Sequence, residues 1–174
     1  MSILEVNRAP VMALWAAVVA ERLGFDRDEA LTLGKTVAGL NAQAKGQRLG
    51  IFEPTENASE QVRYPTEGEP FFVELLGRAV PAINTPDGVR ATAKGAPVPP
   101  ASVQRYLEGK FGAALPEVRR AMEELAAAFP ADELEERAYG LYVRFRPEIP
   151  AGKPGWGAKG ELDTEHIRSL AGKA

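Results

Sequence analysis

The side chains that most often perform chemistry in proteins are almost missing from this chain of 174 residues. It has no cysteine and one histidine, His166, although these residue types supply most general bases, thiol nucleophiles and transition-metal ligands. Asp163, His166 and Ser169 stand three apart, in a superficial likeness to a catalytic triad. Consecutive turns of one short helix, however, provide neither an oxyanion hole nor a second bond that orients the base. We therefore expect Asp163 to cap that helix, and we expect no catalytic set, no metal site and no cofactor.

A glycine-rich hexapeptide, Gly155 to Gly160, fits the pattern G-x-G-x-x-G. In dinucleotide-binding proteins that pattern follows a buried strand and opens a helix, so that the pyrophosphate meets the helix amino end. Here the preceding residues include three prolines, Pro147, Pro150 and Pro154. We therefore interpret the hexapeptide as a structural loop held by its tryptophan. Binding of an anion or a stacked base stays open as the alternative for three residues, Lys153, Trp156 and Lys159.

Two helices near the amino end are the first elements that could position a site. Pro10 suits a first helical turn and Gly24 a helix end. Between them, apolar residues recur three and four apart around Trp15, which predicts an amphipathic helix. Asp26 and Glu29 have the spacing of a capping box, so a second helix is expected to start there.

This second helix carries a ridge of small residues, each four apart: Ala30, Gly34, Ala38 and Ala42. Side-chain size sets the distance between packed helices, so the ridge predicts an unusually close approach by another helix. The neighbour is either the first helix or a second copy of the chain, which would make the ridge the seam of a homodimer.

The helical pair also resembles the start of a helix-turn-helix motif, in which the second helix would read DNA. Acidic residues at the start of the second helix argue against DNA binding, because they would face the negatively charged phosphates. The candidate nucleic-acid contacts, donors for phosphates and base edges, are Lys35, Thr36, Gln43, Gln47 and Arg48, with Lys153, Trp156 and Lys159 assisting.

The whole chain is expected to form one domain of the mainly α (α+β) class, with about six helices. A tight hairpin with Gly77 first in its turn and a type I turn at Thr85 to Gly88 predict a small antiparallel β meander. The expected segments are an amino-terminal helical pair (8–49), a polar loop (53–70), the meander (71–98), a helical group (100–147), and a Gly/Pro-rich loop with a last helix (148–174).

Charge and composition exclude some classes of protein. The net charge of −3 gives no overall basic field for nucleic acid or an acidic membrane. The apolar run from Ala9 to Ala20 is too short to span a bilayer, and the lack of cysteine suits a reducing compartment. We expect a cytoplasmic protein that does not enter membranes.

Five short stretches of the chain are LWAAVVAERLG (14–24), LTLGK (31–35), YLE (106–108), FRP (145–147) and GWGAKGEL (155–162). Together they resemble a family of small uncharacterised bacterial proteins, over nearly the whole chain apart from the polar loop. The resemblance implies a single cytoplasmic bacterial unit and carries over no activity, cofactor or site residue.

Three functions stay open, in this order. The first is a non-enzymatic binding or regulatory protein that works through helix surfaces with an unknown protein partner or as a homo-oligomer. The second is a DNA-binding protein that uses the second helix. The third is an enzyme that relies on carboxylates or a bound cofactor.

Overall fold

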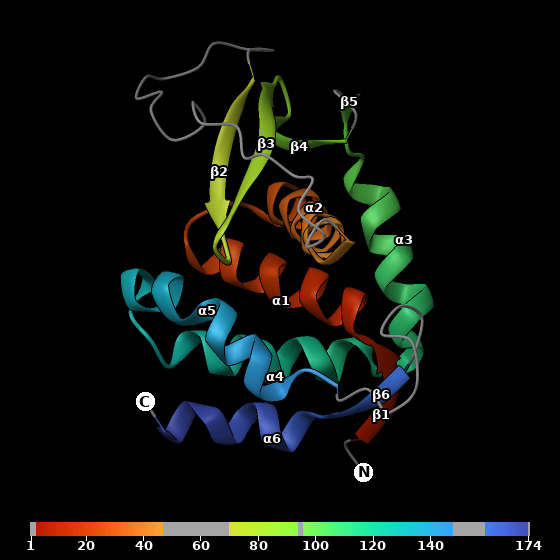
Figure 1. The fold of residues 1–174 in the computed structure, drawn as a ribbon, viewed down its shortest axis with the longest axis vertical. Helices are drawn as coiled ribbons and strands as arrows, with labels where there is room; N and C mark the ends of the chain where they lie inside the picture. Colours follow the sequence, from red (N-terminus) through yellow and green to blue (C-terminus); the bar gives the residue numbers. More distant parts are fainter. Residues whose placement is uncertain (1–2, 47–69, 94–95, 148–158, 174) are drawn as a thin grey trace.

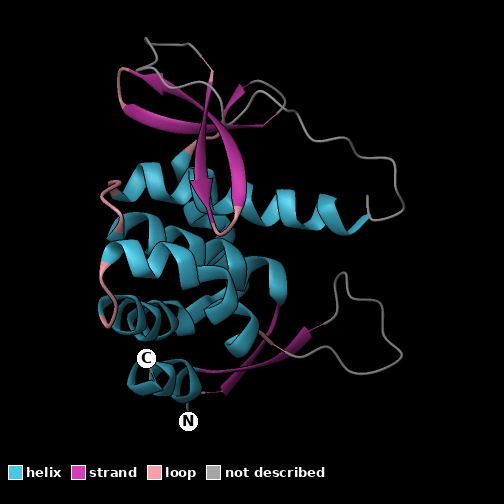
Figure 2. Ribbon diagram, turned by 60° about the vertical axis from the view of Figure 1, so that its left-hand side comes forward, coloured by secondary structure: helices cyan, strands magenta, loops and turns pink. Residues whose placement is uncertain are grey.

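The structure, a computed structural model, describes residues 3–46, 70–93, 96–147 and 159–173. In these residues helices dominate, and two small antiparallel sheets lie at opposite ends of the helical body (Figures 1 and 2). The helices are α1 (Arg8–Arg22), α2 (Arg27–Gly46), α3 (Pro100–Phe111), α4 (Leu115–Ala127), α5 (Ala131–Phe145) and α6 (Thr164–Ser169). The strands are β1 (Ile3–Asn7), β2 (Phe71–Leu75), β3 (Arg78–Thr85), β4 (Gly88–Ala93), β5 (Ala96–Pro97) and β6 (Lys159–Asp163). The predicted α+β fold, with its amino-terminal helical pair, β element and carboxy-terminal helical group, is confirmed.

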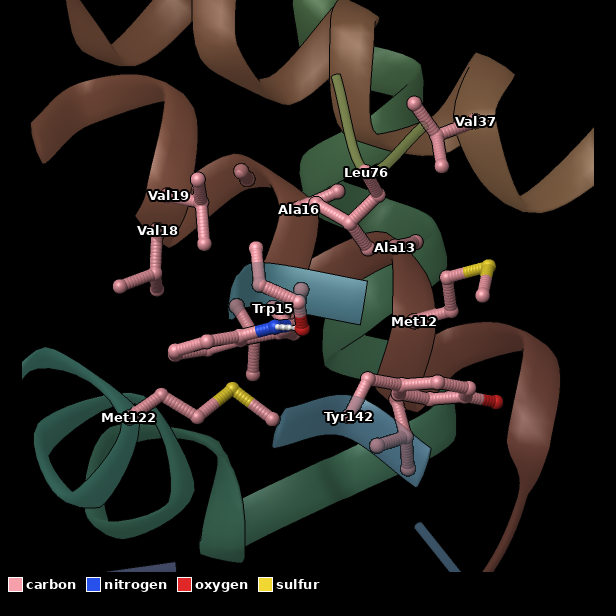
Figure 3. Close-up of a cluster of buried hydrophobic side chains, with 14 of the residues drawn as sticks. Met12, Ala13, Trp15, Ala16, Val18, Val19, Val37, Leu76, Met122 and Tyr142 are labelled. Atoms are coloured by element: carbon pink, nitrogen blue, oxygen red, sulfur yellow. Dashed lines mark hydrogen bonds between the residues drawn. The ribbon is translucent and has the colours of Figure 1, made fainter. Parts of the chain in front are cut away.

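Helix α1 forms the centre of the core. Every residue from Pro10 to Ala20 is buried, because α2 packs on one side of α1 while α4 and α5 pack on the other (Figure 1). The expectation of an amphipathic helix is therefore wrong, since a helix that is apolar all round is buried all round. Trp15 donates its indole N–H to the carbonyl oxygen of Ala138 at 2.9 Å and meets the Phe145 ring edge-on. Figure 3 shows the Trp15 side chain inside this cluster of buried residues.

Helix α2 lies between α1 and the four-stranded sheet (Figure 1). Its predicted capping box is confirmed, because the Asp26 N–H donates to Glu29 Oε1 at 3.0 Å and the Glu29 N–H donates to Asp26 Oδ1 at 2.8 Å. The second oxygen of Glu29 accepts the Val89 N–H at 2.9 Å, and the Thr32 hydroxyl accepts the Ala91 N–H at 3.0 Å. Two side chains of α2 thus satisfy N–H groups along one edge of β4 and fix the sheet on the helix.

The first hairpin turns one residue earlier than its sequence suggests. Leu75 pairs with Arg78, so Leu76 and Gly77 form the two-residue turn, with φ values of 50° and 77°. The prediction that Gly77 opens the turn is wrong, because the side chain of Leu76 is only 4% exposed and points into the core toward Ala13 (Figure 3). A left-handed leucine costs about 1–2 kcal/mol, and burying its side chain offsets that with about 1.5–3 kcal/mol.

The second hairpin has the turn that its sequence predicts. Thr85 pairs with Gly88 across the turn, and the Thr85 hydroxyl accepts the Asp87 N–H at 3.1 Å while donating to the Gly88 carbonyl oxygen at 2.8 Å. The described pairing of β3 with β4 stops at Ala82. The next residue of β3 is Pro81, which has no N–H to continue the ladder.

The second sheet was not predicted, and it joins segments from the two ends of the chain. Strand β1 pairs antiparallel with β6, from Ile3 opposite Asp163 to Asn7 opposite Lys159. Val6 and Leu162 are buried on its inner side. The expected Gly/Pro-rich loop is therefore wrong for its last residues, 159 and 160, which belong to β6. The polar loop expected at 53–70 falls outside the described residues, apart from residue 70.

Candidate functional site

The triad-like residues of α6 do not assemble into a catalytic set. Asp163 Oδ1 accepts the Glu165 N–H at 2.9 Å and so caps α6, as predicted. The Ser169 hydroxyl donates to the backbone oxygen of His166 at 2.7 Å. The exposed His166 ring has its Nε2 atom 3.0 Å from the Arg144 carbonyl oxygen, which requires a hydrogen on Nε2. Each of the three side chains therefore bonds to the backbone instead of to the other two.

Ion pairs between helices account for many of the carboxylates. Arg168 of α6 binds Glu117 at 2.7 Å and Glu124 at 3.1 Å, both on α4, and its hydrogen bond lowers the pKa of Glu117 below the ordinary value. Arg119 of α4 binds Glu21 of α1. Within the described parts of the chain, no three His, Asp or Glu side chains are grouped so that they could hold a metal ion.

The small-residue ridge of α2 packs against α1 of the same chain. Ala30, Gly34 and Ala38 are buried. A Cβ atom placed on Gly34 would lie 2.4 Å from the Ala13 carbonyl oxygen and 2.8 Å from the Ala17 nitrogen, both backbone atoms of α1. The close approach predicted from the ridge therefore occurs inside the protomer, where it leaves these three positions no room for a second copy of the chain. Ala42 belongs to α2, but its side chain is outside the described part.

The candidate nucleic-acid contacts do not form one continuous row in the described residues. Lys35 and Thr36 are half-buried on α2, next to α3 and the sheet. Residue 43 lies in α2 and residue 159 in β6, but their side chains are not described. The remaining candidates, Gln47, Arg48, Lys153 and Trp156, lie outside the described residues.

Lys35 instead belongs to a cluster that sequence reasoning missed. Its Nζ atom lies 4.7 Å from the centre of the Tyr106 ring on α3, and Nζ of Lys110 lies 5.9 Å from the same centre. Tyr106 is half-buried on α3. The four-residue spacing of Tyr106 and Lys110 places them on one helix face, whereas nothing in the sequence links them to Lys35.

Two exposed glycines adjoin this cluster. Gly39 follows Lys35 by one helical turn, and Gly109 lies three residues after Tyr106 and next to Lys110. Within the part of the chain that the structure describes, a Cβ atom on either glycine would meet no atom within 4 Å. We call Lys35, Gly39, Tyr106, Gly109 and Lys110 the α2–α3 face, because the two helices contact each other and these residues share their outer side.

Burial affects the one titratable ring on this face. It raises the pKa of Tyr106 above the ordinary value of 10.0. The hydroxyl therefore keeps its proton at neutral pH and can donate a hydrogen bond.

Comparisons of this chain with protein-family models, with curated proteins and with solved structures found no match. In the part of the chain that the structure describes, no helix has the length and apolar content needed to cross a bilayer. Function is therefore inferred from the residues and geometry of this chain.

Proposed function

We propose that this chain is a non-enzymatic binding protein of the bacterial cytoplasm, which engages a partner across the outer faces of its helices. The observation that carries this proposal is a set of exposed glycines within helices at which a Cβ atom would meet no described atom within 4 Å: Gly39, Gly109 and Gly140. Two of the three belong to the α2–α3 face.

Such glycines are costly unless something requires them. A glycine inside a helix is about 1 kcal/mol less favourable than alanine, because its backbone loses more freedom on folding. At Gly34 the backbone of α1 explains the choice, since no Cβ atom would fit. At Gly39 and Gly140, both well inside their helices, no neighbour among the described residues does so. A partner whose backbone or ligand comes close to the helix would require them.

The other two hypotheses have less support. DNA reading by α2 needs an exposed helix that can enter a major groove, but the turns from Ala30 to Ala38 pack against α1, α3 and the sheet. Enzymatic activity would need a converging set of reactive groups, and the best sequence candidates on α6 are each bonded to backbone atoms. A homodimer remains compatible with the proposal only through a surface other than the small-residue ridge.

The proposal is tested by measuring the native mass of the protein purified from its own cells. The wild type is expected to carry a partner and to exceed the 18.7 kDa of one chain. Gly39→Leu and Gly109→Leu should each lose that partner, because the added side chain occupies the space of the approaching surface. The matched control is Ala101→Leu, which adds leucine at another exposed position of α3, turned away from the α2–α3 face. It should keep the partner. A wild type found only at the mass of one chain, or three variants that behave alike, would refute the proposal.

A further inference from the structure

The α2–α3 face brings two cations to one ring without supplying an anion. Lys35 and Lys110 both have their Nζ atoms within 5.9 Å of the Tyr106 ring centre. One ammonium group over an aromatic ring is favourable, but two like charges close to the same ring repel each other. Among the residues that the structure describes, no carboxylate forms an ion pair with either lysine.

The nearest acidic residue on α3 is already engaged elsewhere. Glu108 accepts a hydrogen bond from the side-chain amide of Gln104 at 3.0 Å, and both residues point away from Tyr106, since they lie two positions from it on the helix. In contrast, Arg119 of α4 and Arg168 of α6 are both paired with glutamates. Among the described residues, Lys35 and Lys110 thus lack the glutamate partners that Arg119 and Arg168 have.

The hydroxyl group of Tyr106 is a third donor at the same place. It has no hydrogen-bond acceptor among the described residues, although the side chain is half-buried. The hydroxyl group and the two ammonium groups are therefore all on or close to one aromatic ring. Exposed glycines on both helices, Gly39 and Gly109, leave space for a ligand to come close to the backbone.

We propose that Lys35, Tyr106 and Lys110 form a binding site for a phosphate group of the partner. A phosphate has several acceptor oxygens and charge enough to pair with two lysines, and charge-assisted hydrogen bonds to it are strong. The inference rests on the proposed function, because it names the chemistry of what binds the α2–α3 face. Two sources carry this chemistry, a free phosphorylated small molecule and the terminal phosphate of a nucleic acid strand.

The site is tested by titrating the isotope-labelled full chain with inorganic phosphate and following its backbone amide signals by NMR. Saturable shifts are expected for residues 35–39 and 106–110, and sodium chloride at the same ionic strength should not produce them. Lys35→Gln and Lys110→Gln should each weaken binding about tenfold, which is the size of one charge-assisted hydrogen bond. Tyr106→Phe, which keeps the ring and removes the third donor, should weaken it less.

The matched control is Arg105→Gln, which removes the same charge from an exposed neighbour on α3 that is not among the cations over the Tyr106 ring. It should change the affinity by less than about twofold, because its charge is screened by solvent and salt. Equal losses for Arg105→Gln and the two lysine variants would show a general effect of charge and overturn the site. The absence of saturable shifts would overturn it as well.

A nucleoside monophosphate and a 5′-phosphorylated oligonucleotide distinguish the two sources. Equal affinity for both indicates a free phosphorylated compound, whereas tighter, strongly salt-dependent binding of the oligonucleotide indicates nucleic acid. Both results support the site, and failure of all three probes overturns it. The phosphate site and the proposed function can be refuted by different results. A partner that is lost in Gly39→Leu but indifferent to Lys35→Gln overturns only the phosphate site.

Discussion

Replacing Gly34 by alanine should destabilise the protein, although alanine is normally the better helix residue. The new Cβ atom would lie 2.4 Å from the Ala13 carbonyl oxygen and 2.8 Å from the Ala17 nitrogen, below the 3.0 Å that real Cβ atoms keep. These two atoms are hydrogen-bond partners in the helical ladder of α1. The methyl group would therefore press on the backbone of a helix that is buried from Pro10 to Ala20, and the two helices would have to separate.

The magnitude follows from two opposing terms. Overpacking a core destabilises a protein by about 1–3 kcal/mol, and we take the upper value because backbone atoms of α1 cannot move aside easily. The better helix propensity of alanine offsets about 1 kcal/mol of this loss. The net loss of about 2 kcal/mol should lower the Tm by about 4–8 °C for a chain of this length. The added Cβ atom of Gly39→Ala, on the same helix, meets no described atom within 4 Å, so this variant should raise the Tm by about 2–4 °C.

Thermal unfolding followed by far-UV circular dichroism measures both variants against the wild type. The comparison is sensitive because the same substitution, on one helix and five residues apart, is expected to have opposite signs. If Gly34→Ala melted at or above the wild-type temperature, the close contact between α1 and α2 would be wrong, and so would the explanation of the small-residue ridge.

Three further predictions concern particular contacts. Leu76→Gly relieves the left-handed backbone but removes a buried side chain, so it should lower the unfolding free energy by about 2 kcal/mol in urea titrations; a stabilised variant would contradict the packing of the hairpin tip. Glu29→Ala removes the capping box and the acceptor of the Val89 N–H and should cost about 2 kcal/mol, whereas the neighbouring Asp28→Ala should cost less than about 0.5 kcal/mol. Burial raises the pKa of Tyr142 to about 12, so the neutral hydroxyl stabilises the fold fully below pH 10.0 and this contribution is lost as the pH rises toward 12. The stability of Tyr142→Phe, measured over the same alkaline range, should fall less steeply than that of the wild type.

Local patterns in the sequence predicted the elements that depend on neighbouring residues. The capping box of Asp26 and Glu29, the cap at Asp163 and the turn at Thr85 to Gly88 all lie where their spacing predicts. Each of these depends on bonds between residues at most three apart, so the chain does not need its tertiary structure to specify them.

Prediction failed where a distant contact outweighed a local preference. The sequence predicts the first hairpin turn one residue too late, because the preference of glycine for a left-handed position does not reveal the core that receives Leu76. Strands β1 and β6 are not predicted, because no turn joins them and each is stabilised by the other from across the chain.

Local spacing in the chain is enough to predict the helical class of this protein, its caps at Asp26 and Asp163, its second turn, and a close approach of another helix to α2. Three features depend on tertiary packing: the approaching helix is α1, residues 10–20 of α1 are all buried, and Lys35 meets Tyr106 and Lys110 on one face. The physical reason is that spacing along a chain specifies which residues share a face of one element, whereas the packing of whole elements specifies which faces meet.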